Sequence, residues 1–227
     1  SSDVCSSDLQ KAGITTTGTG TIDLQAGTSI AMDNGTTTSG AANIRYVATT
    51  TLTVGSITTT GDVSLSASSI TDSGTTDTDV TADELRIVTT GTASGNGAGT
   101  GSKALEISVA KLAADVNGTG TGGLFLTEAN DILVGALNAI NVNQVGTDGS
   151  TLTATTDVAL SEIDSDANLV LVTTAGSIES LSTGGGAITA SGNMLLRAGG
   201  STSNIKLGAV VTNTTVGGNT SLNAGQD

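Results

Sequence analysis

Apolar and polar residues alternate along this chain in short runs, and the runs are separated by stretches rich in Gly, Asn, Asp, Thr and Ser. The apolar members of a run lie two residues apart, as in the pairs Ile22 and Leu24, Val63 and Leu65, Leu124 and Leu126, Ile132 and Val134, and Ile140 and Val142. A period of two places apolar side chains on one face of a β-strand and polar ones on the other. The pattern therefore predicts many short strands joined by loops such as "TSGAAN" and "GTASGNGAGTGS".

Several of these strand patterns recur. The motif Gly-x-x-x-Leu-x-Ala occurs four times, as "GTIDLQA" from Gly20, "GDVSLSA" from Gly61, "GNMLLRA" from Gly192 and "GNTSLNA" from Gly218. A longer unit, "IRYVATTTLTVGSI" from Ile44, aligns without gaps on "LFLTEANDILVGAL" from Leu124, and "ELRIV" from Glu84 is similar to "ALEIS". Constant strands with variable loops are typical of a solenoid whose coils stack on one another. The chain contains no Pro, which agrees with interior strands that donate N–H groups to neighbouring coils.

Residues 103–117 fit two periods. Apolar residues at helical spacing are Leu105, Val109, Leu112 and Val116. Those at strand spacing are Leu105, Ile107 and Val109, followed by Leu112, Ala114 and Val116. We favour two strands with a corner near Ala110, because Leu105 continues the repeat seen at Leu85. A short helix on the flank of the solenoid is the alternative.

The first nine residues, "SSDVCSSDL", differ from the rest of the chain. They contain the single cysteine, Cys5, and they resemble the translation of one reading frame of a common sequencing-library adapter. We therefore interpret residues 1–9 as an adapter-derived artefact and residues 10–227 as one β-solenoid fragment that is uncapped at both ends. On that interpretation the natural chain has no cysteine, which excludes a disulfide-stapled scaffold.

The charge is strongly negative, with 21 acidic and 7 basic residues and a formal net charge of −14 at pH 7. Nucleic acid and anionic membrane surfaces both attract Lys and Arg, so this balance argues against either as a partner. No apolar run approaches the length that spans a bilayer, and we expect no membrane insertion. With one Tyr and one Phe, the core has to be built from thin layers of Val, Ile, Leu and Ala.

The residues needed for most catalytic and metal sites are missing. The chain has no His, which excludes His-dependent triads and the usual Cys/His zinc sites. The stretch "GTGSK" ends on Lys103 but lacks the Gly-Lys-Ser/Thr of a phosphate-binding loop. We therefore assign no catalytic, cofactor-binding or metal-binding residue, and we expect neither enzymatic activity nor a cofactor.

Two acidic stretches are the remaining candidates for chemistry. The stretch from Asp72 to Glu84 contains Asp72, Asp77, Asp79, Asp83 and Glu84, and the stretch from Glu162 to Asp166 contains Glu162, Asp164 and Asp166. Calcium needs several oxygen ligands that converge on one point, and neither stretch has the spacing of an EF-hand loop or of a calcium-binding β-roll. We interpret both stretches as solvated acidic loops. Weak calcium binding, at millimolar concentration, is the alternative.

The units "GDVSLSA" and "GNTSLNAGQD", with the turns "TTTLTVGSI" and "NDILVGAL", resemble the repeats of very large bacterial surface proteins, the filamentous-haemagglutinin-like and autotransporter-type adhesins. The resemblance covers residues 13–227 through composition and loose motifs. It implies a right-handed parallel β-helix, secretion or export to the bacterial cell surface, and a role as stalk or shaft. It transfers no functional residue, because the repeated motif is a packing motif.

We therefore predict an all-β, right-handed parallel β-helix, with one short flanking helix at most, that forms a non-catalytic shaft segment of a giant secreted or cell-surface adhesin. Its partners would be neighbouring repeats of the same polypeptide and, along its flanks, host or environmental surfaces or glycans. One alternative is a polysaccharide lyase-like β-helix enzyme, which requires convergent carboxylates and a basic residue in a groove. The other is an ice-binding solenoid, prompted by "TTTGTGT", which requires a flat Thr ladder of constant spacing.

Overall fold

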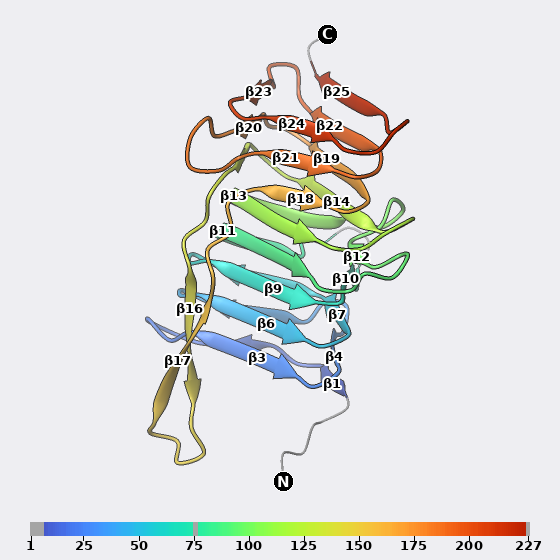
Figure 1. Ribbon diagram of the computed structural model, residues 1–227. Helices are drawn as coiled ribbons and strands as arrows, with labels where there is room; N and C mark the ends of the chain where they lie inside the picture. The colour runs from blue at the N-terminus through green and yellow to red at the C-terminus, as the bar shows by residue number, and fades with distance from the viewer. Residues whose placement is uncertain (1–6, 75–76, 226–227) are drawn as a thin grey trace.

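The computed structural model describes residues 7–74 and 77–225, and within these ranges it contains strands and loops but no helix. Twenty-three strands form one sheet and two form a separate hairpin. The large sheet winds round an axis, because each strand pairs in parallel with the strand one coil further along. In Figure 1 the near strands run from left to right while the chain rises from its N-terminus, which is a right-handed turn. The predicted all-β, right-handed parallel β-helix is confirmed.

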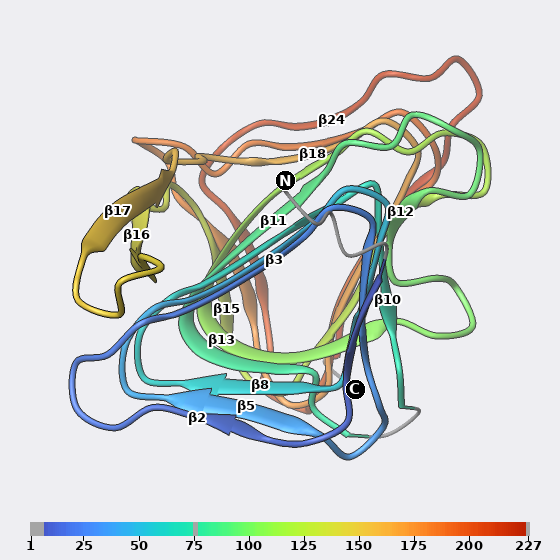
Figure 2. The same cartoon turned by 90° about the horizontal axis from the view of Figure 1, so that it is seen from below.

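The coil has three sides when it is viewed along its axis (Figure 2). The first side stacks β3 (Ile22–Ala26), β6 (Ile44–Ala48), β9 (Val63–Ala67), the second halves of β11 (Val80–Thr89) and β13 (Leu105–Val116), β18 (Ile163–Ser165), β21 (Ile188–Ala190) and β24 (Val211–Asn213). The second side stacks β1 (Ser7–Gln10), β4 (Ser29–Met32), β7 (Thr51–Val54), β10 (Ser69–Asp72), β12 (Gly97–Ala98), β14 (Gly123–Glu128), β19 (Asn168–Thr173), β22 (Met194–Ala198) and β25 (Thr220–Ala224).

The third side begins with β2 (Ile14–Thr15), β5 (Thr37–Gly40) and β8 (Ser56–Thr59). It continues through residues 80–82 of β11 and residues 107–112 of β13 to β15 (Ile132–Val134), β20 (Ile178–Ser180) and β23 (Ile205–Leu207). Coil length varies while the pairing is kept. Ile22 pairs with Ile44 and Ile44 with Val63, which makes coils of 22 and 19 residues. The loops between sides absorb these differences.

The described part of the opening stretch lies in the second side. Residues 7–9 belong to β1, which pairs in parallel with β4. Residues 1–6, including Cys5, lie outside the described residues. None of the described residues belongs to a helix that is long and apolar enough to cross a membrane.

The repeated motifs do not mark one position in the coil. The copies that begin at Gly20 and Gly61 lead into β3 and β9 on the first side, whereas those at Gly192 and Gly218 lead into β22 and β25 on the second. A strand that follows a Gly corner and packs Leu and Ala inward has the same sequence pattern on either side. The motif therefore identifies a strand and its entry corner without identifying the side.

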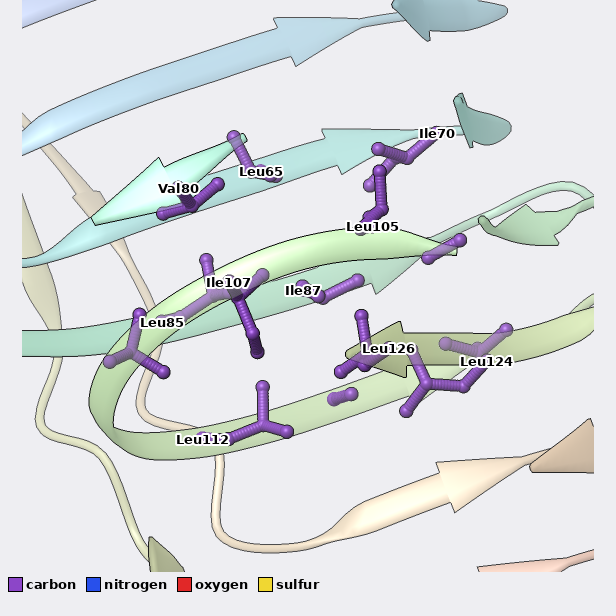
Figure 3. Close-up of a cluster of buried hydrophobic side chains, with 14 of the residues drawn as sticks. Leu65, Ile70, Val80, Leu85, Ile87, Leu105, Ile107, Leu112, Leu124 and Leu126 are labelled. Carbon is purple, nitrogen blue, oxygen red and sulfur yellow. The ribbon is translucent and has the colours of Figure 1, made fainter. Parts of the chain in front are cut away.

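Residues 105–116 form a single strand, β13, so the helix alternative is wrong, and so is the prediction of two separate strands. The prediction that Leu105 continues the repeat at Leu85 is also wrong, because Leu85 pairs with Leu112. The corner near Ala110 is confirmed. Figure 3 shows the ribbon bending between Ile107 and Leu112 with both side chains inside, and pairing with β11 continues on both sides of the bend. The register omits Asp83 and Ala110 at the bend itself, and the Asp83 N–H donates to the Gly61 carbonyl instead. The backbone therefore finds partners at the corner without forming a helix.

The core is a column of aliphatic side chains that point inward from all three sides. Ten of them are labelled in Figure 3, namely Leu65, Ile70, Val80, Leu85, Ile87, Leu105, Ile107, Leu112, Leu124 and Leu126. All ten are fully buried, and burying each contributes about 1.5–3 kcal/mol relative to exposure. The stability of the rod is therefore distributed over its coils.

One closed polar group interrupts this column in the first coils. Tyr46 Oη donates to Gln10 Oε1 at 2.9 Å, Gln10 Nε2 donates to Thr38 Oγ1 at 2.8 Å, and Thr38 Oγ1 lies 2.6 Å from Tyr46 Oη. Burial raises the pKa of Tyr46 to about 12. Each polar atom of the triangle has a partner, so the core tolerates it.

The hairpin β16 (Ile140–Val145) and β17 (Leu152–Asp157) is an antiparallel insertion between β15 and β18. It runs along the outside of the first side towards the N-terminal coils (Figures 1 and 2). Asp157 fixes it there, because Arg45 Nε lies 2.9 Å from Asp157 Oδ1 and Ser64 Oγ donates to Asp157 Oδ2 at 2.6 Å. Arg86 Nε also donates to the Val158 carbonyl at 3.0 Å. The hairpin thus connects consecutive coils from outside.

Candidate functional site

Three acidic side chains converge at the corner between the second and third sides. One carboxylate oxygen from each of Asp72, Asp79 and Glu106 lies within 4.8 Å of the others. Asp72 and Asp79 belong to the first of the two acidic stretches that were singled out in the sequence. Glu106 comes from β13, one coil further along, and was not predicted.

Backbone pairing positions these three residues. Asp72 ends β10 and pairs with Val54, whose side chain points into the core. Asp79 precedes β11, and its N–H donates to the Glu106 carbonyl at 2.7 Å. Because Val80 and Ile107 point inward and pair with each other, Asp79 and Glu106 occupy outward positions on adjacent coils. At the corner, the inward carboxylate of Asp72 therefore lies close to the outward carboxylates of Asp79 and Glu106.

The other residues of the first acidic stretch do not join the cluster. Asp77 and Asp83 are exposed, and Glu84 forms an ion pair with Lys111. Thr75 and Thr76, within the same stretch, lie outside the described residues. Only two of its five acidic side chains therefore contribute to the cluster.

Asp72 and Asp79 are buried and Glu106 is half-buried, and the oxygens of the cluster are incompletely paired. The exposed fractions of Asp72 and Asp79 are 5% and 1%. Asp72 Oδ1 accepts a hydrogen bond from the Gly74 N–H at 2.5 Å, and Asp79 Oδ2 accepts one from the Glu106 N–H at 2.9 Å. Asp72 Oδ2 and Glu106 Oε2 are buried atoms with no hydrogen-bond partner. Burying an ionised carboxylate without partners is strongly unfavourable.

One cation compensates part of this charge. The Lys103 ammonium donates to the Asp72 carbonyl at 2.7 Å and lies 3.5 Å from Asp72 Oδ2. Burial, with the charges of Asp72 and Glu106, raises the pKa of Asp79 to about 9. Burial and the charge of Asp72 also raise the pKa of Glu106. Three carboxylates against one ammonium therefore retain a proton at neutral pH unless a cation replaces it.

A hollow of about 490 Å³ opens beside Asp79 on the third side. Its lining comprises Asn34, Gly35, Thr37, Gly55, Ser56, Thr58, Ser73, Gly74, Asp77, Thr78, Asp79 and Thr81. These residues offer hydroxyl, amide and carboxylate oxygens but no basic or aromatic side chain. The hollow therefore gives water access to one edge of the cluster.

The second acidic stretch shows no comparable convergence within the described chain. Glu162 and Asp166 are exposed, and Asp164 is half-buried in β18. Burial and the charges of Asp166 and Glu162 raise the pKa of Asp164. Because the three residues are two positions apart, their side chains share the outward face of the strand, where they form a solvated acidic edge.

Another buried carboxylate, Glu128, lies at the end of β14 and is 0% exposed. Its Oε2 accepts from the Val109 N–H and its Oε1 from the Asn130 N–H, both at 3.0 Å. Burial raises the pKa of Glu128 to about 7. Glu128 continues the inward alternation of Leu124 and Leu126, and an acidic residue in that phase is a signal from which the sequence could have identified it.

Outward hydroxyl groups also form a file on the third side. Pairing places Thr15, Ser39, Thr58, Thr81 and Ser108 in one line across five coils. The neighbouring outward line begins with Thr37 and Ser56 and reaches the buried Asp79, whose carbonyl accepts from the Ile57 N–H at 2.8 Å. On the third side the hydroxyl file is thus one mixed Ser/Thr line beside the carboxylate cluster, and Ser69 with Thr51 and Thr71 with Thr53 pair on the second side.

Comparisons of the chain with protein-family models, with curated proteins and with solved structures found no match.

Proposed function

We propose that this chain is a non-catalytic shaft segment of a secreted or cell-surface bacterial adhesin. The observation that carries the proposal is the unbroken parallel ladder on the first side, from β3 to β24, around one aliphatic core. A ladder of this kind makes every coil a support for the next, with a rise of about 4.8 Å per stacked strand. Such a rod separates whatever is attached to its two ends. The adhesin-like repeats in the sequence support the same role.

The carboxylate cluster fits a glycoside-cleaving site poorly. Catalytic carboxyl groups lie on either side of the scissile bond with the sugar ring between them, whereas one oxygen from each residue of this cluster converges on a common point. The Asp72 side chain is buried in the corner, where a sugar ring has no access. The adjacent hollow offers no aromatic platform among its lining residues. The geometry therefore favours a shaft over a polysaccharide-cleaving enzyme.

The hydroxyl file fits an ice-binding surface poorly. Ordering of water by a solenoid requires a flat array of Thr in parallel lines. Here one line mixes Ser39 and Ser108 with Thr, and the line beside it leads to Asp79. Threonine is a favourable outward residue in strands, which explains its abundance without an ice-binding role.

The shaft proposal can be tested by displaying the full chain on a bacterial surface between an anchor and a small binding module. We expect the module to stand at one fixed height, whereas a Gly/Ser linker of equal length should give a broad range of heights. Super-resolution measurement of the module relative to the membrane reads this out. A spread equal to that of the flexible linker would contradict the proposal, as would turnover of a polysaccharide by the purified chain.

A further inference from the structure

We propose that Asp72, Asp79 and Glu106 form a binding site for one divalent cation, with calcium preferred. The inference goes beyond the shaft function and is independent of it, because a rod can fold and act as a spacer with or without the ion.

Unpaired oxygens in this corner are the first argument. The described residues contain four buried side-chain oxygens without a hydrogen-bond partner, and Asp72 Oδ2, Ser73 Oγ and Glu106 Oε2 are three of them. The exposed fraction of Asp72 is 5%. Buried polar atoms normally find partners. Asp72 Oδ2 and Glu106 Oε2 belong to one cluster and both lack a hydrogen-bond donor, with the Lys103 ammonium 3.5 Å from Asp72 Oδ2. Two such acceptors side by side indicate that a cation completes them.

The charge balance is the second argument. Lys103 contributes one positive charge at 3.5 Å from Asp72 Oδ2, against three carboxyl groups. A divalent cation would bring the four side chains close to neutrality. Asp77, two residues before Asp79 in the same stretch, is exposed, so solvent screens its charge.

The ligand chemistry favours calcium. Calcium accepts six to eight oxygen ligands at about 2.3–2.6 Å in irregular arrangements, whereas magnesium needs a near-octahedral set. Oxygens on one calcium ion are therefore separated by up to about 5 Å, which agrees with the 4.8 Å limit of this cluster. Water from the hollow beside Asp79 can supply the remaining ligands.

Isothermal titration of the chelator-treated full chain with CaCl2 at pH 7.5 tests the proposal. We expect one ion per chain with a Kd of about 0.1–1 mM, the range of extracellular modules, and at least tenfold weaker binding of MgCl2. Asp79→Asn should weaken calcium binding at least tenfold. Asp77→Asn, which removes one exposed charge from the same stretch, should leave the affinity within twofold.

Thermal unfolding provides a readout that does not depend on a variant. Calcium at about 10 mM should raise the Tm of the unmodified chain, and circular dichroism should show that Asp79→Asn retains its strands. Glu106→Gln serves as a second variant if Asp79→Asn fails to fold. Absence of both binding heat and a Tm shift at that concentration would overturn the proposal. Equal calcium affinity of the folded Asp79→Asn and Asp77→Asn variants would do so as well.

Discussion

The described residues bury carboxylates at two corners of the solenoid, and the two corners differ in the hydrogen bonds that the carboxylate oxygens receive. At the end of β14, Glu128 is alone, and its two oxygens accept backbone N–H groups from Val109 and Asn130. At the end of β10, Asp72 meets Asp79 and Glu106, and two of their oxygens have no hydrogen-bond partner. Both corners have raised carboxyl pKa values. The difference lies in how fully the oxygens are paired.

The comparison shows when backbone hydrogen bonds alone can stabilise a buried carboxylate. Backbone donors at a coil corner satisfy one carboxylate, because a turning strand leaves N–H groups that point towards the inside of the bend. The same corner cannot satisfy three carboxylates, since their mutual repulsion adds to the loss of hydration. A fully paired Glu128 thus needs no ligand, whereas the cluster of Asp72, Asp79 and Glu106 needs protons or a cation.

Removal of Glu128 should produce the largest effect. Glu128→Ala leaves the Val109 and Asn130 N–H groups without their acceptor, and each such loss costs about 1–3 kcal/mol. We expect the free energy of unfolding to fall by about 2–6 kcal/mol, as measured by urea denaturation at pH 6. A loss below about 0.5 kcal/mol, the range of neutral surface changes, would show that the pairing at this corner is unimportant.

The pH dependence of stability should separate the two corners. Raised pKa values mean that the folded state holds protons that the unfolded state has lost, so stability falls as pH rises. For Glu128 the fall should occur between pH 4.5 and about 7, and for Asp79 between pH 3.8 and about 9. Saturating calcium should reduce the loss of Tm between pH 7 and 9 and leave the loss between pH 4.5 and 7 unchanged. An equal effect of calcium on the loss of Tm in both pH ranges would show that the two corners do not differ in calcium binding.

Neutralising Asp79 should stabilise the calcium-free chain. An Asn at position 79 can still accept from the Glu106 N–H, and its amide can donate to a neighbouring carboxylate oxygen. We expect Asp79→Asn to raise the free energy of unfolding at pH 8 by on the order of 1–3 kcal/mol, the range for satisfying a buried polar group. Chemical denaturation in a chelating buffer measures this. Destabilisation of the folded variant under these conditions would contradict the assignment of unfavourable charge to the cluster.

The smallest effect is expected at Asp77, which lies in the same stretch but is exposed. Asp77→Asn should change the free energy of unfolding by less than about 0.5 kcal/mol at any pH from 5 to 8. Denaturation curves of Asp77→Asn and Asp79→Asn, measured under the same conditions, provide the comparison. An effect as large as that of Asp79→Asn would mean that general acidic repulsion, rather than burial, sets the behaviour of this corner.

The sequence was sufficient to predict the architecture because alternation and Gly corners repeat along the whole chain. It did not distinguish the three sides, since Leu85 and Leu105 occupy equivalent strand patterns on different sides. The outward hairpin was also missed. Its alternation, as in Ile140 and Val142, resembles that of the coil strands, and only the pairing with β17 shows its antiparallel direction.

The candidate site was partly predictable. Asp72 follows Ile70 in the inward phase, so an acidic residue inside the core pattern marked the corner. Glu106 stands in the outward phase between Leu105 and Ile107, where a charged residue is normally solvated. Its burial depends on the pairing of Val80 with Ile107, a contact between coils that no local pattern encodes.

The most direct test is a crystal structure of the full chain grown with calcium, with anomalous diffraction data collected to locate the ion. We predict one anomalous peak between Asp72, Asp79 and Glu106, at about 2.3–2.6 Å from their oxygens, and none beside Glu128. A cluster without a peak in calcium-grown crystals, or a calcium ion held at Glu128 instead, would contradict it.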